Sequence, residues 1–404
     1  MSALSNLRYV GDDTIISAAQ PTNNTRRSGE LLVAQYDLAQ VAATTDRDQI
    51  ARGPTSLWRY AALLPLDDPE NAVTLDEGWT PLIPAIRLGN TLGLEQLFIK
   101  DEGRNPSGTF KDRGASVAIS RARELGIRTV IHNSSGNAGG AWGLYAARAG
   151  LRCINILPHD VLPASCLQSV LSGAVTVQLN DRWQRAGPLV QETAARNGWF
   201  NVGTLREPYR LEGKKTMGLE LCEQLGWIMP DVIVYPAGGG LGVIAIYKAF
   251  DELEELGWIK KGRRPRLVIT QYRGCAPIVR AFRERATEVE EWDDIDVLPG
   301  GLKSSNPGGG RAVLQLVRET GGICVDISTQ EALDAAAEIA ATEGVFACPE
   351  SATTLVGLRK AMDVLPILPS NKVVLMSTGS GLKSIPNFPT PTPIVLQPGE
   401  ELHL

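Results

Sequence analysis

The chain has only three histidines and six cysteines among its 404 residues, and no two cysteines form a C-x-x-C pair. A structural zinc site needs cysteine or histidine ligands clustered at short spacings, so we expect no metal site. The cysteines stand singly and mostly in apolar segments, which favours reduced thiols over disulfides. Because histidines are so few, we expect another residue type to act as the base in any catalysis.

The chain also has no large excess of positive or negative charge. The chain carries 40 Lys and Arg against 45 Asp and Glu, for a formal net charge of −5, and its cations are scattered. This argues against nucleic acid as a partner. No apolar run is long enough to span a bilayer, and the first residues lack the pattern of a secretory signal. We therefore expect a cytoplasmic protein without a membrane partner.

The chain is long enough for two lobes with cores of their own, and hydrophobic residues make up 43% of it. Short apolar runs alternate with helical stretches, which predicts parallel sheets covered by helices on both faces. The predicted strands begin at Thr129, Cys153, Val175, Val232, Leu267 and Val373. The predicted helices include Ala141–Ala149, Ala164–Leu171, Ala186–Arg196 and Val243–Phe250. A junction near Leu205–Lys215 separates two such series and predicts a cleft between two α/β lobes.

The two ends of the chain show little periodicity. Residues 1 to about 30 are polar and rich in turn formers, which predicts a loosely ordered arm, and one or two short helices are expected between Leu31 and Leu64. The tail from Ser384 to Leu404 contains five prolines. It is either an extended segment that lies on a partner subunit or a frayed end.

The first candidate for chemistry is the lysine in Asn105-Pro-Ser-Gly-Thr-Phe-Lys-Asp-Arg-Gly. Asn-Pro-Ser-Gly is typical of a turn, and Lys111 follows at the predicted start of a helix. A partly desolvated lysine at a helix N-terminus has its charged form disfavoured, and the neutral amine suits Schiff-base formation. An isolated lysine in such a place is more often simply solvated, so this motif alone leaves both interpretations open.

Two glycine-rich turns each join a predicted strand to a predicted helix. Ser134-Ser-Gly-Asn-Ala-Gly-Gly offers helix N-terminal N–H groups to an anion, with Asn137 as a hydrogen-bonding side chain. Pro236-Ala-Gly-Gly-Gly-Leu-Gly forms a nest of N–H groups suited to a phosphate. It lacks the ending of an ATP-binding P-loop and the spacing of a dinucleotide site. We predict a phosphate ligand other than ATP or NAD, against the alternative of a structural turn.

A hydroxyl group follows the last predicted strand, in Ser377-Thr-Gly-Ser-Gly-Leu-Lys. The carboxyl ends of strands are where α/β sheets place their ligands, although a plain turn is the commoner explanation.

In this order, the lysine, the asparagine turn, the glycine nest and the late hydroxyl resemble the tryptophan-synthase-β group of pyridoxal-phosphate enzymes (fold type II). Within that group the chain is most similar to the threonine synthase family. The similarity extends over Tyr36-Asp-Leu, Glu77-Gly-Trp-Thr-Pro-Leu, Glu207-Pro-Tyr-Arg-Leu-Glu-Gly-Lys-Lys-Thr and Thr378-Gly-Ser-Gly-Leu-Lys. It implies an α/β fold of two lobes, each a mostly parallel sheet flanked by helices, with pyridoxal 5′-phosphate in the cleft between them.

The resemblance also implies roles for single residues. Lys111 would be the catalytic lysine that bonds the cofactor, Asn137 would lie beside the pyridoxal 3′-oxygen, and Thr378 would face the pyridine nitrogen. The cofactor phosphate would be bound by backbone N–H groups of Gly238, Gly239, Gly240, Leu241 and Gly242. The substrate carboxylate would be held by Ser135, Gly136 and Asn137, and the substrate phosphate by Arg210, with Lys214 or Lys215 in support.

We expect an N-terminal arm and helices over 1–79, a large cofactor-binding domain over 80–127 and 214–404, and a small α/β domain over 128–213. We also expect a homodimer. The chain departs from the family pattern at Ala138, Ser380 and Ser384, where threonine, histidine and aspartate are common. Thr204-Leu205 stands where Asn-Ser is common. Some relatives begin with a four-cysteine zinc ribbon, and the corresponding stretch here has no cysteine.

Three functions follow from this comparison. The first is conversion of O-phosphohomoserine and water to threonine and phosphate. The second keeps the cofactor but performs β-elimination or β-replacement on serine, threonine or a related amino acid, which the departures from the family pattern favour. The third is a silent, cofactor-free regulatory protein, against which the intact Lys111 and glycine nest argue.

Overall fold

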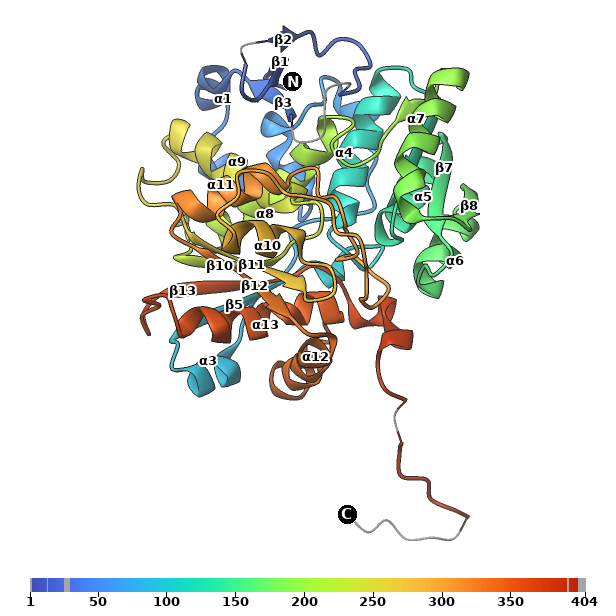
Figure 1. The fold of residues 1–404 in the computed structure, drawn as a ribbon. Coiled ribbons are helices and arrows are strands. Elements are labelled where there is room, and N and C mark those ends of the chain that lie inside the picture. Colours follow the sequence, from blue (N-terminus) through green and yellow to red (C-terminus); the bar gives the residue numbers. More distant parts are fainter. Residues whose placement is uncertain (1, 13, 25–29, 391, 399–404) are drawn as a thin grey trace.

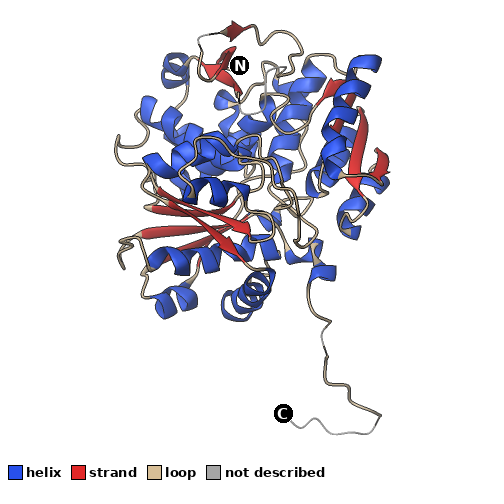
Figure 2. Cartoon of the chain, viewed as in Figure 1, coloured by secondary structure: helices blue, strands red, loops and turns tan. Residues whose placement is uncertain are grey.

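The computed structural model describes residues 2–12, 14–24, 30–390 and 392–398, and this part of the chain forms three β-sheets with helices around them (Figures 1 and 2). Within it, no helix has both the length and the apolar character needed to cross a membrane.

The largest sheet has the strand order β12-β11-β10-β13-β5-β4 and is parallel except for β4, which runs antiparallel to β5. Its strands are β4 (Leu82–Pro84), β5 (Gln96–Asp101), β10 (Val232–Pro236), β11 (Arg266–Tyr272), β12 (Ile323–Ile327) and β13 (Lys372–Ser377). One face is covered by α8 (Tyr209–Gln224), α9 (Leu241–Glu255), α10 (Pro277–Arg283) and α11 (Gly310–Glu319). The other face is covered by α3 (Ile86–Leu92), α12 (Thr329–Glu343) and α13 (Pro349–Met362).

The apolar run in β10 explains why helices lie on both faces of this sheet. Ile233 and Tyr235 pack into the core formed with α8 and α9, whereas Val232 and Val234 pack into the core formed with α12 and α13. Successive side chains of a strand point to opposite faces, so a strand that is apolar throughout needs cover on both. The predicted double cover is therefore confirmed for this sheet.

The second sheet is parallel and has the order β8-β7-β6-β9. Its strands are β6 (Thr129–Asn133), β7 (Arg152–Pro158), β8 (Val175–Leu179) and β9 (Phe200–Asn201). Its helices are α4 (Lys111–Glu124), α5 (Asn137–Ala149), α6 (Pro163–Leu171), the short η4 (Trp183–Arg185) and α7 (Ala186–Asn197). Val130 of β6 packs against the side of α4 and α5, and its neighbour Ile131 packs against α7.

The expectation of a loosely ordered N-terminal arm is wrong where strands β1 and β2 lie. Three antiparallel strands form a sheet of order β2-β1-β3: β1 (Leu4–Tyr9), β2 (Ile15–Ile16) and β3 (Leu32–Tyr36). The pairing of Leu7 with Ala34 joins residues far apart in sequence, and each strand alone gives a weak pattern. Residues 25–29 of the expected arm lie outside the described residues. The helices that follow are α1 (Leu38–Thr44), α2 (Arg47–Ala51), η1 (Leu57–Leu63) and η2 (Pro69–Asn71).

The junction between the two larger sheets and the C-terminal tail were also predicted from the sequence. The junction expected near Leu205–Lys215 contains the start of α8, so the chain passes between the two larger sheets partly as a helix. After η5 (Gly381–Lys383) and η6 (Ile385–Asn387), the C-terminal tail runs extended away from the body (Figure 1). Its residues 391 and 399–404 lie outside the described part. All six cysteines are free thiols.

Candidate active site

The predicted site residues follow the carboxyl ends of strands β5, β6, β9, β10 and β13. They line two adjoining cavities. The outer cavity has a volume of about 520 Å³ and the inner cavity about 60 Å³, and both are lined by Lys111, Gly239 and Gly301. The outer cavity is also lined by Ser135, Arg210 and Leu241. The inner cavity is also lined by Asn137, Gly238, Gly240, Gly242 and Thr378. Gly136 lines neither, but it stands between two residues that do.

Lys111 is the first residue of α4, and hydrogen bonds hold its own backbone and that of Phe110 before it. The N–H of Lys111 donates to Thr109 Oγ1 over 3.3 Å, and the N–H of Phe110 donates to the carbonyl of Thr378 over 3.1 Å. The Lys111 ammonium lies 3.9 Å from the centre of the Phe110 ring. Burial, with a further contribution from Arg210, lowers the pKa of Lys111 to about 7. The amine is thus held where a large neutral fraction exists near neutral pH.

The glycine nest connects β10 to α9. Gly240 has φ of +84°, in the left-handed region, and α9 then starts without a side-chain cap. Within the described residues, no protein acceptor receives the N–H groups of Gly238 to Gly242. A Cβ added at Gly239 would meet only Thr204 Cγ2, at 3.4 Å, whereas one at Gly242 would collide with the Tyr235 hydroxyl at 1.9 Å. The nest is therefore an open cradle of unpaired donors at a helix N-terminus, which suits an anion.

The asparagine turn lies between β6 and α5. Ser134 Oγ accepts from the N–H groups of Gly136 and Gly139, at 3.1 and 3.0 Å, and so shapes the turn. Gly136 has φ of +137°, which favours glycine, and Asn137 is the first residue of the helix. Ser165 Oγ of α6 donates to Asn137 Oδ1 over 3.0 Å. The oxygen of Asn137 is thus engaged, and its amide group lies at the inner cavity.

Thr378 follows β13 and is buried. Its hydroxyl lies 3.5 Å from Ser351 Oγ, and Ser351 in turn lies 3.0 Å from the thiol of Cys348. These groups come from the start of α13 and the end of β13. They form a chain of two hydroxyl groups and one thiol at the inner cavity.

Arg210 and Lys214 lie one turn apart on α8, and both line the outer cavity. Arg210 Nη1 donates to Thr204 Oγ1 over 3.1 Å, and Nη2 donates to the carbonyl of Val202. Its Nε lies 3.5 Å from Glu207 Oε1. Burial lowers the pKa of Arg210 to about 10, and burial together with Lys111 and Arg210 lowers the pKa of Lys214 well below its usual value. Lys215, the other candidate, is instead paired with Glu212 and Glu252.

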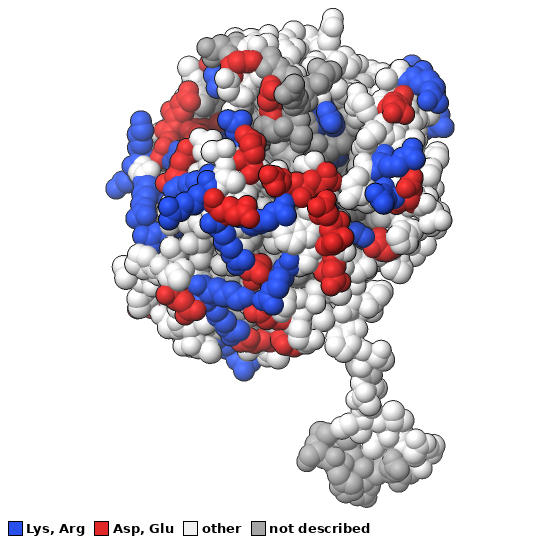
Figure 3. All heavy atoms as spheres, viewed as in Figure 1, with Lys and Arg blue, Asp and Glu red and all other residues white. Residues whose placement is uncertain are grey.

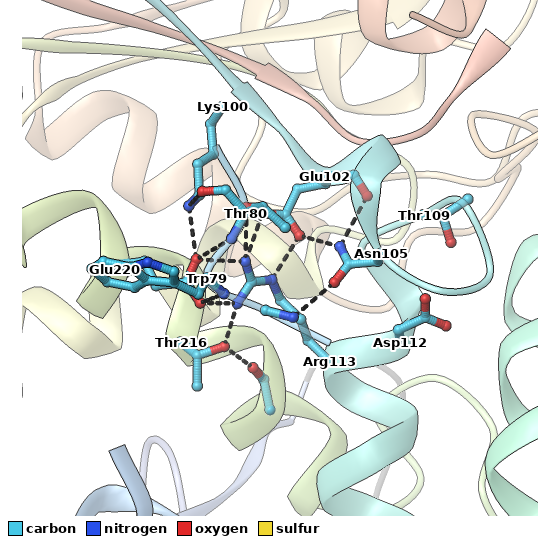
Figure 4. Close-up of polar contacts among 12 residues, drawn as sticks. Trp79, Thr80, Lys100, Glu102, Asn105, Thr109, Asp112, Arg113, Thr216 and Glu220 are labelled. Atoms are coloured by element: carbon cyan, nitrogen blue, oxygen red, sulfur yellow. Dashed lines mark hydrogen bonds and ion pairs between the residues drawn. The ribbon is translucent and has the colours of Figure 1, made fainter. Parts of the chain in front are cut away.

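A fully buried polar network fixes the element that carries Lys111 (Figure 4). Arg113, two residues later on α4, contacts Glu102 at 2.6 Å and Glu220 of α8 at 2.5 Å. Lys100 of β5 reaches Glu220 at 2.7 Å. Trp79 and Thr80 donate their backbone N–H groups to the same carboxylate, at 2.7 and 3.2 Å. The network therefore ties α4 to α8 and to the segment that contains Glu77-Gly-Trp-Thr.

Several lining residues were not identified from the sequence. Glu350 lines the inner cavity, where Oε1 accepts the N–H of Gly301 over 2.7 Å, and no described residue donates to its buried Oε2. Lys303, on the segment that closes the outer cavity, pairs with Asp160 of the loop after β7 at 2.5 Å. The only signal for this segment was its run of glycines around Asn306-Pro-Gly-Gly-Gly.

A protein-family model and several sequence relatives match most of this chain. The family described as "Pyridoxal-phosphate dependent enzyme" matches residues 73–379. A threonine synthase from Methanocaldococcus jannaschii is 33% identical over 88% of this chain and 87% of its own. One from Halalkalibacterium halodurans is 34% identical over 86% and 97%, and one from Mycobacterium tuberculosis 32% over 85% and 94%.

Solved structures share the fold at lower identity. A threonine deaminase from Solanum lycopersicum superposes with a TM-score of 0.65 at 18% identity, covering 90% of this chain and 98% of that one. A diaminopropionate ammonia lyase from Escherichia coli reaches 0.66 at 15%, covering 96% and 97%.

Proposed function

The chain belongs to the threonine synthase family of pyridoxal-phosphate dependent enzymes, and from this premise we propose how its own residues carry out the reaction. The reaction is the conversion of O-phosphohomoserine and water to threonine and phosphate, in an enzyme of the lyase class. The predicted fold type, with its parallel sheets and flanking helices, is confirmed.

The residues at the inner cavity fit the cofactor. The amine of Lys111 would bond it, the free N–H groups of Gly238 to Gly242 would hold its phosphate, and Asn137 would lie beside its ring oxygen. When bound, the cofactor withdraws electrons from the carbon that bears the substrate amino group. Thr378 would face the ring nitrogen with a neutral hydroxyl, which leaves that nitrogen unprotonated and the ring a weaker electron sink.

The choice between a phosphorylated and an unphosphorylated substrate rests on two basic residues, Arg210 and Lys214. Both are buried and both line the outer cavity, where Glu207 is their nearest acidic neighbour among the described residues and Glu291 is a second acidic residue of the lining. Burial lowers the pKa of both groups, so their charged forms are costly there unless an anion joins them, and a phosphate supplies that charge. The hydroxyl of serine or threonine would not. We therefore infer a substrate with a phosphate at its far end.

Other residues would hold the opposite end of this substrate. Ser135 and the N-terminal N–H groups of α5, next to Gly136 and Asn137, offer donors to a carboxylate. Lys111, with a pKa near 7, is suited to accept and return a proton at neutral pH. Arg210 and Lys214 would balance the charge of the departing phosphate.

One observation bears on the second candidate, a β-eliminating or β-replacing enzyme. Ala138 lines the outer cavity with a methyl group where relatives offer a hydroxyl, so one contact to a phosphate is missing. Thr204 also lines this cavity, and its hydroxyl accepts from Arg210 while keeping its own O–H to donate. These departures weaken the phosphate site without removing its cations.

The test is a direct comparison of substrates on the purified holoenzyme. Phosphate released from O-phosphohomoserine, with stoichiometric threonine, supports the proposal. Keto-acid formation from serine or threonine at a higher kcat/KM, with no phosphate release, would replace it with the eliminase.

The arrangement of the molecule adds further proposals. We propose that the large domain over 80–127 and 214–404 is built on the six-stranded sheet and the small domain over 128–213 on the four-stranded one.

We also propose a homodimer, because α6 and β8 expose a set of large apolar side chains: Leu167, Val170, Leu171, Val175 and Val177. Sedimentation velocity tests this by giving twice the mass of one chain. A cytoplasmic location is proposed from the sequence alone, and cell fractionation tests it.

A further inference from the structure

A third cavity lies at the amino-terminal ends of strands in the large sheet, opposite the ends that the active-site residues follow. It has a volume of about 730 Å³, and we call it the basal pocket. It is lined by Val232 and Arg266, which begin β10 and β11, and by Asn371, just before β13. The active-site residues follow the other ends of these strands. Helix α9 runs from the glycine nest toward these amino-terminal ends, and its 15 residues span roughly 22 Å. The basal pocket is therefore separate from the active site.

Positive charge dominates the lining of the basal pocket. Its cationic side chains are Arg47, Lys260, Arg263, Arg264 and Arg266, and Asp231 is the one acidic residue among the described residues that line it. Arg264 is already paired with Asp251 and Glu254, at 2.5 and 2.6 Å. Lys260 and Arg263 have no acidic partner within the described ranges. Figure 3 shows Lys and Arg side chains gathered along the left edge of the molecule.

Aromatic side chains form another part of the wall. Trp227 and Trp258 meet edge to face with ring centres 5.7 Å apart, and the Arg47 guanidinium lies 5.8 Å from the Trp227 ring centre. Trp227 has φ of +63°, which a side chain of this size rarely adopts. Its N–H donates to the carbonyl of Cys222 over 2.6 Å and holds that conformation. Such strain tends to persist where it serves a binding site.

We propose that the basal pocket binds a small molecule that joins an aromatic ring to phosphate, the chemistry of a nucleotide. The ring would pack against Trp227 and the exposed side chains of Ile228 and Leu368, and the phosphate would be held by Lys260 and Arg263. The volume is within the range of small-molecule sites. Asp231 does not oppose this, because its carboxylate is turned to the N–H of Lys372, at 2.7 Å. This site takes no part in the proposed reaction.

The experiment is equilibrium dialysis of the holoenzyme against three probes: ADP, adenosine and pyrophosphate. We expect ADP to saturate one site per chain, with adenosine and pyrophosphate each roughly tenfold weaker or more, since each keeps only half of the contacts. Arg263→Ala should weaken ADP binding by roughly tenfold or more. Lys261→Ala is the matched control, because Lys261 has the same charge, lies on the same exposed loop and does not line the pocket. It should change binding by less than about twofold.

Further variants separate this site from the active site. Arg210→Ala should leave ADP binding unchanged. If that variant abolishes binding, ADP occupies the active site and the proposal is overturned. Equal losses in Arg263→Ala and Lys261→Ala would also overturn it, since they would indicate diffuse attraction, and so would the absence of saturation by any probe. Lys260→Ala gives a second test if Arg263→Ala fails to fold.

Discussion

Arg113 and Glu220 form an ion pair at 2.5 Å in which neither side chain has any exposure to solvent. Arg113 lies two residues after Lys111 on α4, and Glu220 lies six residues after Lys214 on α8. The pair thus fixes the distance between the helix that presents the catalytic lysine and the helix that presents the phosphate-binding cations. One buried contact therefore positions both helices.

We expect Arg113→Met to be strongly destabilising. It leaves Glu102 without its arginine and removes one of the two cations, Arg113 and Lys100, that pair with Glu220. Breaking a buried pair costs about 3–5 kcal/mol of the free energy of unfolding. Urea denaturation measures this. The control is Arg311→Met, which removes a pair with both side chains about two-thirds exposed and should cost less than about 1 kcal/mol. Equal losses in the two variants would contradict a special role for the buried pair.

We expect the cofactor on Lys111. Borohydride reduction of the holoenzyme, followed by peptide mapping, should place the pyridoxyl group on the peptide that contains this lysine. Lys214 is the natural rival, because it too lines the outer cavity and has a lowered pKa. A Lys214→Ala variant should still be labelled at Lys111. Label on Lys214, Lys100 or Lys383 in the parent enzyme would overturn the site assignment.

We expect Gly239→Val to lose the cofactor and keep the fold. The added side chain would point into open space, with Thr204 Cγ2 at 3.4 Å as its nearest neighbour, so it would occupy the place of the phosphate without disturbing the protein. Cofactor absorbance per chain should fall well below that of the parent, while circular dichroism stays the same. Gly262→Val, on an exposed loop with space around it, is the control. Full occupancy in Gly239→Val would refute the nest as phosphate site.

We expect Arg210→Ala to lower kcat/KM for O-phosphohomoserine by roughly ten- to a hundred-fold, because it removes a charge-assisted bond to the leaving group. Inorganic phosphate should inhibit the parent enzyme competitively and the variant hardly at all. Arg185→Ala, which changes a largely exposed arginine, controls for charge. If Arg210 only braces the helix start through Glu207, the melting temperature would fall with no kinetic defect specific to the phosphorylated substrate.

We expect the cofactor to load onto the apoenzyme with a midpoint near pH 7. Lys111 reacts as the neutral amine, and its pKa is lowered to about 7, so the loading rate should rise through neutral pH and level off above it. An ordinary lysine would keep gaining up to about pH 10. Arg210→Ala removes a positive neighbour, which raises the pKa of Lys111, so the midpoint should move to higher pH. A rate that still climbs at pH 9 in the parent would contradict the lowered pKa.

The sequence predicted those parts of the structure that depend on local patterns. The apolar run of β10 and the glycines after it were visible as a strand and a nest, and Lys111 was identified at its helix start. The partners of Arg113 were not predictable, because Glu102, Glu220 and Lys100 are brought together only by folding. Glu350 was missed for the same reason, since it enters the inner cavity from α13 with no motif around it. The N-terminal sheet was missed because its strands are short and pair over long distances.

The position of β13 in the large sheet has a consequence for the synthesis of this protein. The strand that lies between β5 and β10 is the last of the sheet to be made, after about 270 further residues have followed β5. At roughly 5–20 residues per second, the nascent chain waits on the order of tens of seconds with the middle of its largest sheet missing. The edge of β5 that will meet β13 stays unpaired during that time, and so does the matching edge of β10 once β10 has been made. Unpaired strand edges are places where other chains can attach. A ribosome that stops before residue 372 would release a chain that has most of the residues of the active site but lacks both Thr378 and the strand that leads to it.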